Sequence, residues 1–272
     1  MNNISGKEFY NALVSGICKV ISQHEHLNKI NVFPVPDGDT GTNLLFTLRP
    51  IIKIKDDISE NFGQTLSLIS NTAIDSARGN SGTIMAQYFI GMSEVSLDFE
   101  NLSNQNLSEI LDAGYNAAKD SMSDPKEGTI ITVMKDIVNI SQNQKNNDDI
   151  LATFEDIYNE SIISLNNTPE QMQLLKDSGV VDAGAQGFVD LLEGLCYYLK
   201  NKEFINPESI NDSDIEETEN TINIENYDQS SYQFCTECLV EGNNIDRKLM
   251  KEKLTEMGDS FILAGTKSKV KI

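Results

Sequence analysis

Long apolar runs are absent from this chain of 272 residues. It has no apolar stretch near the roughly 18 residues that a membrane-spanning helix requires. The start, Met1-Asn2-Asn3-Ile4-Ser5, lacks the basic and apolar regions of a signal peptide. We therefore expect no membrane insertion, and cytoplasmic residence is the default expectation.

Basic residues are also scarce. The chain has 21 Lys and Arg against 42 Asp and Glu, which gives a formal net charge of −21. Nucleic acid and anionic membranes would be repelled by this charge, so we expect neither as a direct partner. A nucleotide would need metal cations in order to bind such an acidic protein.

Cysteine and histidine are few, at four and two residues. Cys18 and Cys196 fall on the apolar stripes of predicted helices, which favours buried thiols over a disulfide framework. Cys235 and Cys238 have Cys-x₂-Cys spacing, which alone is a weak zinc signal, and residues three apart on a strand face opposite sides. The two histidines lie two apart near the end of the first predicted helix, so they do not share a face.

The most informative segment, residues 31–43, reads NVFPVPDGDTGTN. Pro34 and Pro36 remove backbone donors and bias their neighbours to extended geometry, so this segment is not helical. Its two glycines permit a tight turn, and a helix with apolar periodicity follows. Asp37 and Asp39 place two hard oxygen ligands beside this turn at a helix N-terminus, which suits Mg²⁺ and a phosphate chain. The segment therefore indicates the handling of a nucleotide polyphosphate.

Helical periodicity recurs through the first 200 residues, whereas period-2 alternation is almost absent there. Ser5 and Glu8 form a capping box that opens the first helix. Further helices are predicted over 62–73, 84–92, 107–122, 130–140, 150–165 and 188–199, with a short helix after Thr168-Pro169. The fold class is therefore all-α, as an antiparallel helical bundle or barrel.

The composition changes after residue 203. Residues 204–231 are rich in Asn, Glu, Asp, Ser and Thr, which is typical of a solvated acidic linker, although a functional charge run is the alternative. The last segment, 232–272, is predicted as the opening of a small α+β domain. Its elements are a strand over 232–240, a helix over 246–257, and strands over 261–264 and 270–272. Because no closing element follows, we expect the natural chain to be longer. The predicted units are 1–203, 204–231 and 232–272.

Four glycine-containing turns each precede a predicted helix, at residues 37–41, 77–82, 126–129 and 181–187. One such turn alone is most simply a helix connection in which glycine allows left-handed backbone. In an up-and-down bundle, however, alternate loops lie at the same end. Helices that open at Thr40, Asn80, Thr129 and Ala183 are then able to point their N-termini at one site. An ADP or ATP pyrophosphate held by backbone N–H groups requires that arrangement.

The motifs NVFPVPDGDTGTN, ARGNSG at 77–82 and GVVDAGAQG at 179–187 resemble the nucleotide-binding domain of dihydroxyacetone kinases. The resemblance is greatest to the version in kinase–DegV fusion proteins and in the A subunit of bacterial fatty acid kinase. It covers about residues 1–200, and FCTE at 234–237 and GDS at 258–260 look like the start of that family's middle domain. The resemblance implies an eight-helix antiparallel barrel with ATP at the end that carries the glycine loops.

This resemblance implies that Asp37 and Asp39 hold two Mg²⁺ ions against the phosphates and so carry catalysis. A third metal ligand lies slightly upstream and is an aspartate in dihydroxyacetone kinases. Here the nearest candidate is Asn31, which departs from that pattern and adds no charge. Arg78 either neutralises phosphate charge or forms a surface or structural ion pair. The implied nucleotide-binding positions are Thr40, Gly41, Thr42, Asn43, Asn80, Ser81, Gly82, Gly128, Thr129, Asp182, Ala183 and Gly184.

Phosphoryl transfer needs in-line placement and neutralised charge more than a protein nucleophile. The resemblance implies transfer from Mg–ATP to the carboxylate of a fatty acid that a DegV-like lipid-binding protein or fused domain holds, which yields an acyl phosphate. One alternative is a subunit of a dihydroxyacetone (glycerone) kinase, and the other is a regulatory module that holds ADP without transfer. A homodimer is one possible assembly.

The resemblance also bears on zinc. In the fatty acid kinase family, the cysteine that matches Cys235 joins two histidines of a later His-x-His segment in a zinc site. This sequence contains no such segment. We therefore expect the zinc site to be incomplete in these 272 residues.

Overall fold

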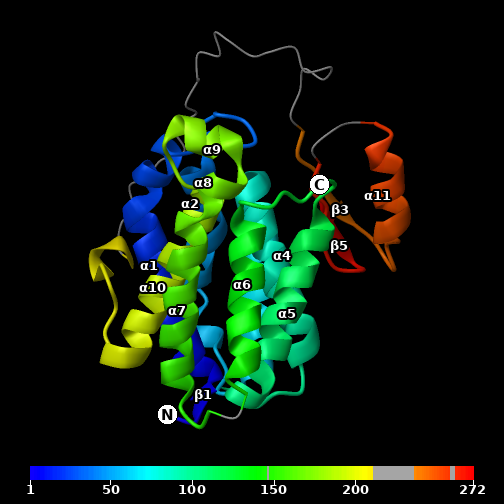
Figure 1. Cartoon of the computed structure of the whole chain (residues 1–272). Helices are drawn as coiled ribbons and strands as arrows, with labels where there is room; N and C mark the ends of the chain where they lie inside the picture. Colours follow the sequence, from blue (N-terminus) through cyan, green and yellow to red (C-terminus); the bar gives the residue numbers. More distant parts are fainter. Residues whose placement is uncertain (146, 211–235, 258–260) are drawn as a thin grey trace.

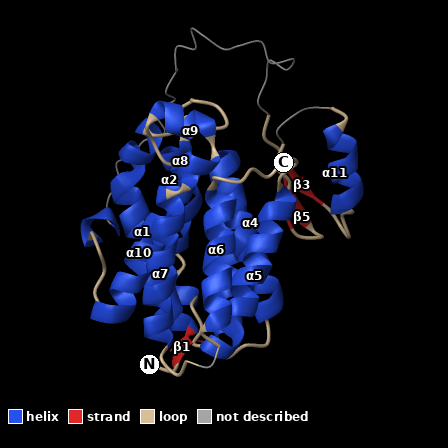
Figure 2. Cartoon of the chain, in the orientation of Figure 1, coloured by secondary structure: helices blue, strands red, loops and turns tan. Residues whose placement is uncertain are grey.

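A computed structural model describes residues 1–145, 147–210, 236–257 and 261–272, and the structural statements below concern these ranges. Within them, long helices form one antiparallel bundle (Figure 1, Figure 2). These helices are α1 (Gly6–Lys29), α2 (Thr40–Ile52), α3 (Phe62–Ser76), α4 (Gly79–Ser96), α5 (Asn104–Ser121), α6 (Ile130–Asn143), α7 (Ile150–Asn166) and α10 (Ala183–Asn201). The predicted all-α fold class is confirmed, and every helix predicted in this region is present.

The first and last long helices pack along each other and close the bundle, with α7 on the other side of α10. Two glycines make this contact possible. A Cβ atom on Gly16 would lie 2.3 Å from the carbonyl oxygen of Leu191, and one on Gly194 would lie 2.4 Å from that of Ser15. The backbones of α1 and α10 are therefore closer than two side-chain-bearing helices allow.

Helix α4 lies at the centre of the packing, since α2, α3, α5 and strand β4 (Ala264–Gly265) all contact it. It is buried along most of its length. Tyr88 on α4 packs edge-on against Phe188 on α10, with ring centroids 5.4 Å apart. The buried α4, held by these contacts, fixes the position of the glycine loop at its N-terminus.

The opposite end of the bundle holds a two-stranded antiparallel ribbon of β1 (Asn3–Ser5) and β2 (Asn101–Ser103), which the sequence pattern did not indicate. At the start of α1, the Ser5 side chain accepts a hydrogen bond from the Glu8 N–H at 3.3 Å, which is one of the two hydrogen bonds of the predicted capping box. The Glu8 side chain pairs with Lys202. Cys18 and Cys196 are buried, as expected. The remaining short helices are η1 (Lys55–Asp57), α8 (Thr168–Gln171), α9 (Gln173–Ser178) and η2 (Pro207–Ile210).

Residues 236–257 and 261–272 form a unit that we call the C-terminal module. Its antiparallel sheet has the order β3 (Leu239–Glu241), β5 (Lys269–Lys271), β4, with α11 (Arg247–Thr255) between β3 and β4 in sequence. The module shares the core of the bundle because Ala264 belongs to the main hydrophobic cluster. The Gly265 N–H donates to Oε1 of Gln87 on α4 at 2.7 Å. The module is therefore docked on α4 (Figure 1).

Some predicted features lie outside the described residues. These are residues 211–231 of the acidic linker, residues 232–235 of the first predicted C-terminal strand with Cys235, and the GDS motif at 258–260. Cys238 is described and exposed. No helix in the described ranges is both long and apolar enough to cross a bilayer.

Candidate functional site

The up-and-down path of the chain brings the four glycine loops to one end of the bundle (Figure 1). Helices α2, α4, α6 and α10 all begin there, whereas the β1–β2 ribbon marks the other end. The N-terminal N–H groups of four helices therefore face the same end of the molecule.

The predicted metal ligands lie in the turn between α1 and α2. Asp37 and Asp39 are partly buried there. The Nδ2 of Asn31 donates to Oδ1 of Asp37 at 2.6 Å, while the Oδ1 of Asn31 is buried without a hydrogen-bond partner among the described residues. An unsatisfied amide oxygen beside two carboxylates is a hard donor set of the kind that Mg²⁺ prefers. These residues therefore fit a magnesium ion.

No group of three or more His, Cys, Asp and Glu side chains suited to a metal occurs in the part of the chain that the structure describes. A metal at this turn would consequently take two carboxylates with a neutral amide, and the phosphates and water would supply the remaining ligands, as is usual for Mg²⁺.

The carboxylates of this turn are crowded. The pKa of Asp39 is raised to about 6, first by burial and then by the negative charge of Asp37, while a hydrogen bond from Asn43 opposes the rise. The charge of Glu237, from the C-terminal module, acts in the same direction as that of Asp37. A divalent cation would favour the charged form of both carboxylates.

The first turn of α2 is capped by a residue that the sequence analysis did not single out. The Oδ1 of Asn28, on α1, accepts from the N–H groups of Gly41 at 2.7 Å and Thr42 at 3.1 Å. Its Nδ2 donates to Oγ1 of Thr42 at 2.9 Å. Because Asn28 lies near the end of α1, it ties the first glycine loop to the preceding helix and satisfies two of the amides predicted to bind phosphate.

The second glycine loop lies against the first. The hydroxyl of Ser81 donates to the carbonyl of Thr40 at 3.4 Å. Gly79 has a φ of +55°, and a Cβ there would lie 2.1 Å from Nδ2 of Asn43, so only glycine suits this position. The guanidinium of Arg78 stacks 4.6 Å from the ring centre of Phe46.

The third and fourth glycine loops are joined by one buried carboxylate. The Oδ2 of Asp182 accepts from the N–H groups of Ala185 at 2.8 Å and Ile130 at 3.1 Å, so it caps both α10 and α6. Burial raises the pKa of Asp182 to about 6, although these two hydrogen bonds oppose the rise. Asp182 therefore has the geometry of a structural cap shared by two helices.

The other predicted nucleotide-binding residues differ in accessibility. Asn80 is exposed and Gly184 is partly buried, whereas Gly82, Gly128, Thr129 and Ala183 are buried. The Gly128 N–H donates to Oγ1 of Thr132 at 2.9 Å. All of these residues lie on the four loops at the shared end, and their contacts with a nucleotide stay predictions.

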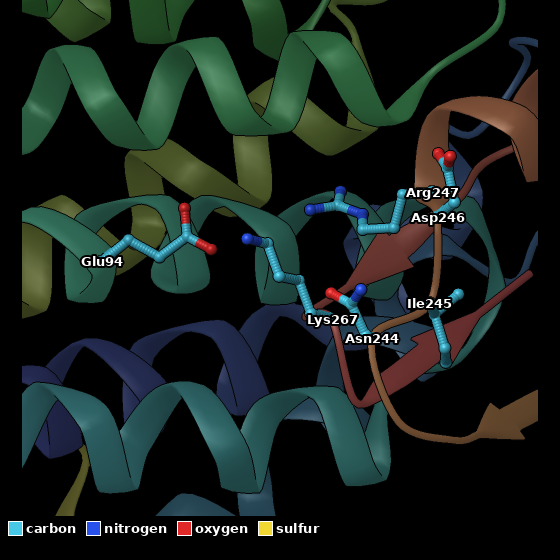
Figure 3. A pocket seen from close by; sticks show the side chains of 6 residues that line it. All are labelled: Glu94, Asn244, Ile245, Asp246, Arg247 and Lys267. Carbon is cyan, nitrogen blue, oxygen red and sulfur yellow. The ribbon is translucent and has the colours of Figure 1, made fainter.

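A pocket of about 470 Å³ lies between α4 and the C-terminal module (Figure 3). It is bordered by Glu94 near the C-terminal end of α4, so it lies far along the helix from the glycine loop. Its module side presents Asp246, Arg247 and Lys267. Burial lowers the pKa of Arg247, against the nearby charges of Glu94 and Asp120. Acidic and basic groups face each other here, so the lining favours no single class of ligand.

Comparison with known proteins gives this arrangement a family context. The model of the DAK2 domain family matches residues 34–197, and that of the fatty acid kinase A-like middle domain matches residues 231–272. Uncharacterized proteins from Staphylococcus saprophyticus and Staphylococcus haemolyticus are each 30% identical over the whole chain. The chain spans about half the length of these curated relatives, at 51% of each.

Two crystal structures of the dihydroxyacetone kinase from C. freundii share the fold. The complex with AMP-PNP and Mg²⁺ has a TM-score of 0.55 at 18% identity, and covers 69% of this chain and 33% of that one. The native form has a TM-score of 0.54 at 18% identity, and covers 70% and 34%. The match of the DAK2 model extends over more than half of the chain, from the carboxylate turn through most of α10. The chain therefore belongs to the DAK2 domain family, with a C-terminal segment of the fatty acid kinase A-like middle-domain type.

Proposed function

We propose that the end of the bundle with the glycine loops binds Mg–ATP and supports transfer of its γ-phosphoryl group. The observation that carries this proposal is the cluster of Asp37, Asp39 and the unsatisfied Oδ1 of Asn31 beside the N-terminus of α2. The dihydroxyacetone kinase with the same fold was crystallised with AMP-PNP and Mg²⁺, which supports this choice of ligand.

Each group has a distinct task in this proposal. Asp37 and Asp39 hold the metal with the amide oxygen of Asn31, and Mg²⁺, when bound, neutralises phosphate charge. The N-terminal turns of α2 and α4 direct the positive ends of their helices at the phosphates. The N–H groups of Gly41, Thr42 and Gly79 exchange Asn28 and Glu237 for phosphate oxygens when the nucleotide binds. Thr40, Thr42 and Ser81 add hydroxyl groups at the same place. None of these residues acts as a nucleophile in this proposal, which agrees with a reaction that depends on positioning and electrostatics.

We further propose that the acceptor is the carboxylate of a fatty acid, held by a DegV-like lipid-binding protein or domain. Attack of a carboxylate oxygen on the γ-phosphorus gives an acyl phosphate and ADP. The match of residues 231–272 to a fatty acid kinase A-like middle domain supports this acceptor over dihydroxyacetone. The fold shared with dihydroxyacetone kinase favours dihydroxyacetone as the second candidate.

The test uses the purified chain and three variants. Thermal stabilisation by Mg–ADP is expected in the wild type and lost in Asp37→Asn and Asp39→Asn. The matched control is Asp98→Asn, which removes the same charge at an exposed site beyond the C-terminal end of α4. Acyl phosphate is then measured with ATP and a fatty acid, with and without a DegV-like fatty-acid-binding protein.

The outcomes separate the candidate functions. Acyl phosphate that depends on the partner protein supports the fatty acid kinase reaction, and phosphorylation of dihydroxyacetone instead supports the second candidate. Tight Mg–ADP binding without transfer to either acceptor contradicts the kinase proposal and favours a regulatory ADP-holding module. Equal Mg–ADP stabilisation in all variants contradicts the metal site itself.

A further inference from the structure

An acidic residue of the C-terminal module reaches the second glycine loop. The backbone N–H of Gly79, the first residue of α4, donates to Oε1 of Glu237 at 2.7 Å. The N-cap residue Arg78 does not cap this helix with its own side chain. The first N–H groups of a helix lack partners within the helix, and here a carboxylate from 158 residues further along the chain satisfies one of them.

Two lysines of β5 reinforce this contact. The Nζ of Lys271 lies 3.2 Å from Oε2 of Glu237 and also donates to the carbonyl of Ala77. The Nζ of Lys269 lies 2.5 Å from Oδ1 of Asp75. Three side chains of the C-terminal module thus hold residues 75–79, which end α3 and begin α4. The module and the glycine loop are coupled by these contacts.

The carboxylate of Glu237 occupies a place suited to a phosphate oxygen. Both groups are anions that accept hydrogen bonds from the N-terminal amides of a helix. The single Gly79 N–H cannot donate a full hydrogen bond to the Glu237 carboxylate and to a phosphate oxygen at the same time. The Gly79 amide lies beside the first glycine loop, since a Cβ on Gly79 would lie 2.1 Å from Nδ2 of Asn43. The negative charge of Glu237 also contributes to the raised pKa of Asp39 in that loop. Its side chain is 44% exposed, so solvent reaches it where it contacts the loop.

We propose that Glu237 is an internal competitor for the Gly79 amide, so that nucleotide binding and docking of the C-terminal module oppose each other at the second glycine loop. This inference rests on the proposed nucleotide function. When the phosphates take the Gly79 N–H, Glu237 leaves it and the module loosens from residues 75–79. Nucleotide binding at the glycine loop thereby changes how tightly the C-terminal module is docked on the bundle.

The test compares Glu237→Ala with Glu241→Ala in the full chain. Glu241 is also in the module and pairs with Lys269 at 3.3 Å, so both variants remove one negative charge from the same module. Affinity for Mg–ADP is measured by titration calorimetry. Glu237→Ala is expected to bind roughly three- to tenfold more tightly than the wild type, the size of one hydrogen bond no longer displaced. Glu241→Ala is expected to bind as the wild type does.

Amide hydrogen exchange, measured without and with nucleotide, gives a second readout. The Gly79 amide is expected to exchange faster in Glu237→Ala than in the wild type, and saturating Mg–ADP is expected to speed exchange in β3 of the wild type. Unchanged or weaker Mg–ADP binding in Glu237→Ala contradicts the proposed competition between Glu237 and phosphate. An equal gain in Mg–ADP affinity in Glu241→Ala also contradicts it. In both cases the proposed nucleotide function stands. A wild type that does not bind Mg–ADP refutes both, and Gly79 exchange then still reports whether Glu237 covers the amide.

Discussion

Replacing Asp39 with asparagine separates the binding role of this residue from its effect on folding. Burial and the charge of Asp37 raise the pKa of Asp39 from 3.8 to about 6, so the folded protein favours the protonated form. The stability associated with this group is complete below the ordinary pKa and is lost as pH rises through about 6. Above pH 6, the charged carboxylate therefore destabilises the metal-free protein.

The size of this effect follows from the shift. Each pKa unit corresponds to about 1.4 kcal/mol, and the partial exposure of Asp39 reduces the total through solvent screening, so we expect roughly 1–2 kcal/mol. The Asp39 side chain makes no capping hydrogen bond to α2, so its replacement by asparagine removes no capping interaction. Asp39→Asn should then melt a few degrees higher than the wild type at pH 8 without metal, since about 2–4 °C accompanies each kcal/mol in a protein of this size.

The assay is thermal unfolding followed by circular dichroism, with a metal chelator, at pH 5 and at pH 8. The gain in melting temperature should be clear at pH 8 and smaller at pH 5, where the wild-type carboxyl is mostly protonated. Addition of Mg–ADP should then stabilise the wild type by ligand mass action and leave Asp39→Asn unchanged. A variant that melts lower than the wild type at pH 8 without metal would refute the electrostatic reasoning, and one that retains the Mg–ADP response would refute the ligand assignment.

Substitutions at three further positions test the packing of the helices and of the C-terminal module. Asp182→Ala removes the shared acceptor of two helix N-termini and should lower the free energy of unfolding by about 2–4 kcal/mol. Asp182→Asn keeps an acceptor oxygen and should lower it less. Equal losses for the two variants in denaturant titrations would contradict the capping role. Gly194→Ala sets a methyl group 2.4 Å from the Ser15 carbonyl oxygen and should cost about 1–3 kcal/mol by calorimetry, whereas an unchanged melting temperature would contradict the close helix contact. Gln87→Leu leaves the buried Gly265 N–H without its acceptor and should speed hydrogen exchange in β4 but not in α6. Equal protection of β4 in the wild type and in Gln87→Leu would argue against this docking contact.

The helices could be predicted because their signals are local. Apolar periodicity located every long helix. The N-cap Ser5 and the proline of Thr168-Pro169 marked the first turns of α1 and α8. Topology then followed, because short connections in an all-α chain force neighbours to run antiparallel. The shared end of the four glycine loops was predictable for the same reason.

The partners of the site amides could not be predicted, because they come from residues whose local sequence carries no signal. Asn28 is one of several polar residues near the end of α1, and only the packing of α1 on α2 sets it over the Gly41 amide. Glu237 lies in a segment that resembles a separate domain, yet its carboxylate meets Gly79. The β1–β2 ribbon was missed since three-residue strands are too short for a period-2 pattern.

The two halves of the glycine-loop end differ in how firmly their amides are held, and this difference locates the phosphates. The amides that open α6 and α10 bond to Asp182, which is 4% exposed, so a ligand would have to displace a buried carboxylate that bridges two helices. The amide that opens α4 bonds to Glu237, whose side chain is 44% exposed. The Gly41 and Thr42 amides of α2 bond to the partly buried amide oxygen of Asn28, which carries no charge. Exchange of a solvent-facing carboxylate for a phosphate oxygen costs much less than exposure of a buried one. We therefore expect the phosphates at the loops that open α2 and α4, and we expect changes at Asp182 to act on folding before they act on nucleotide affinity.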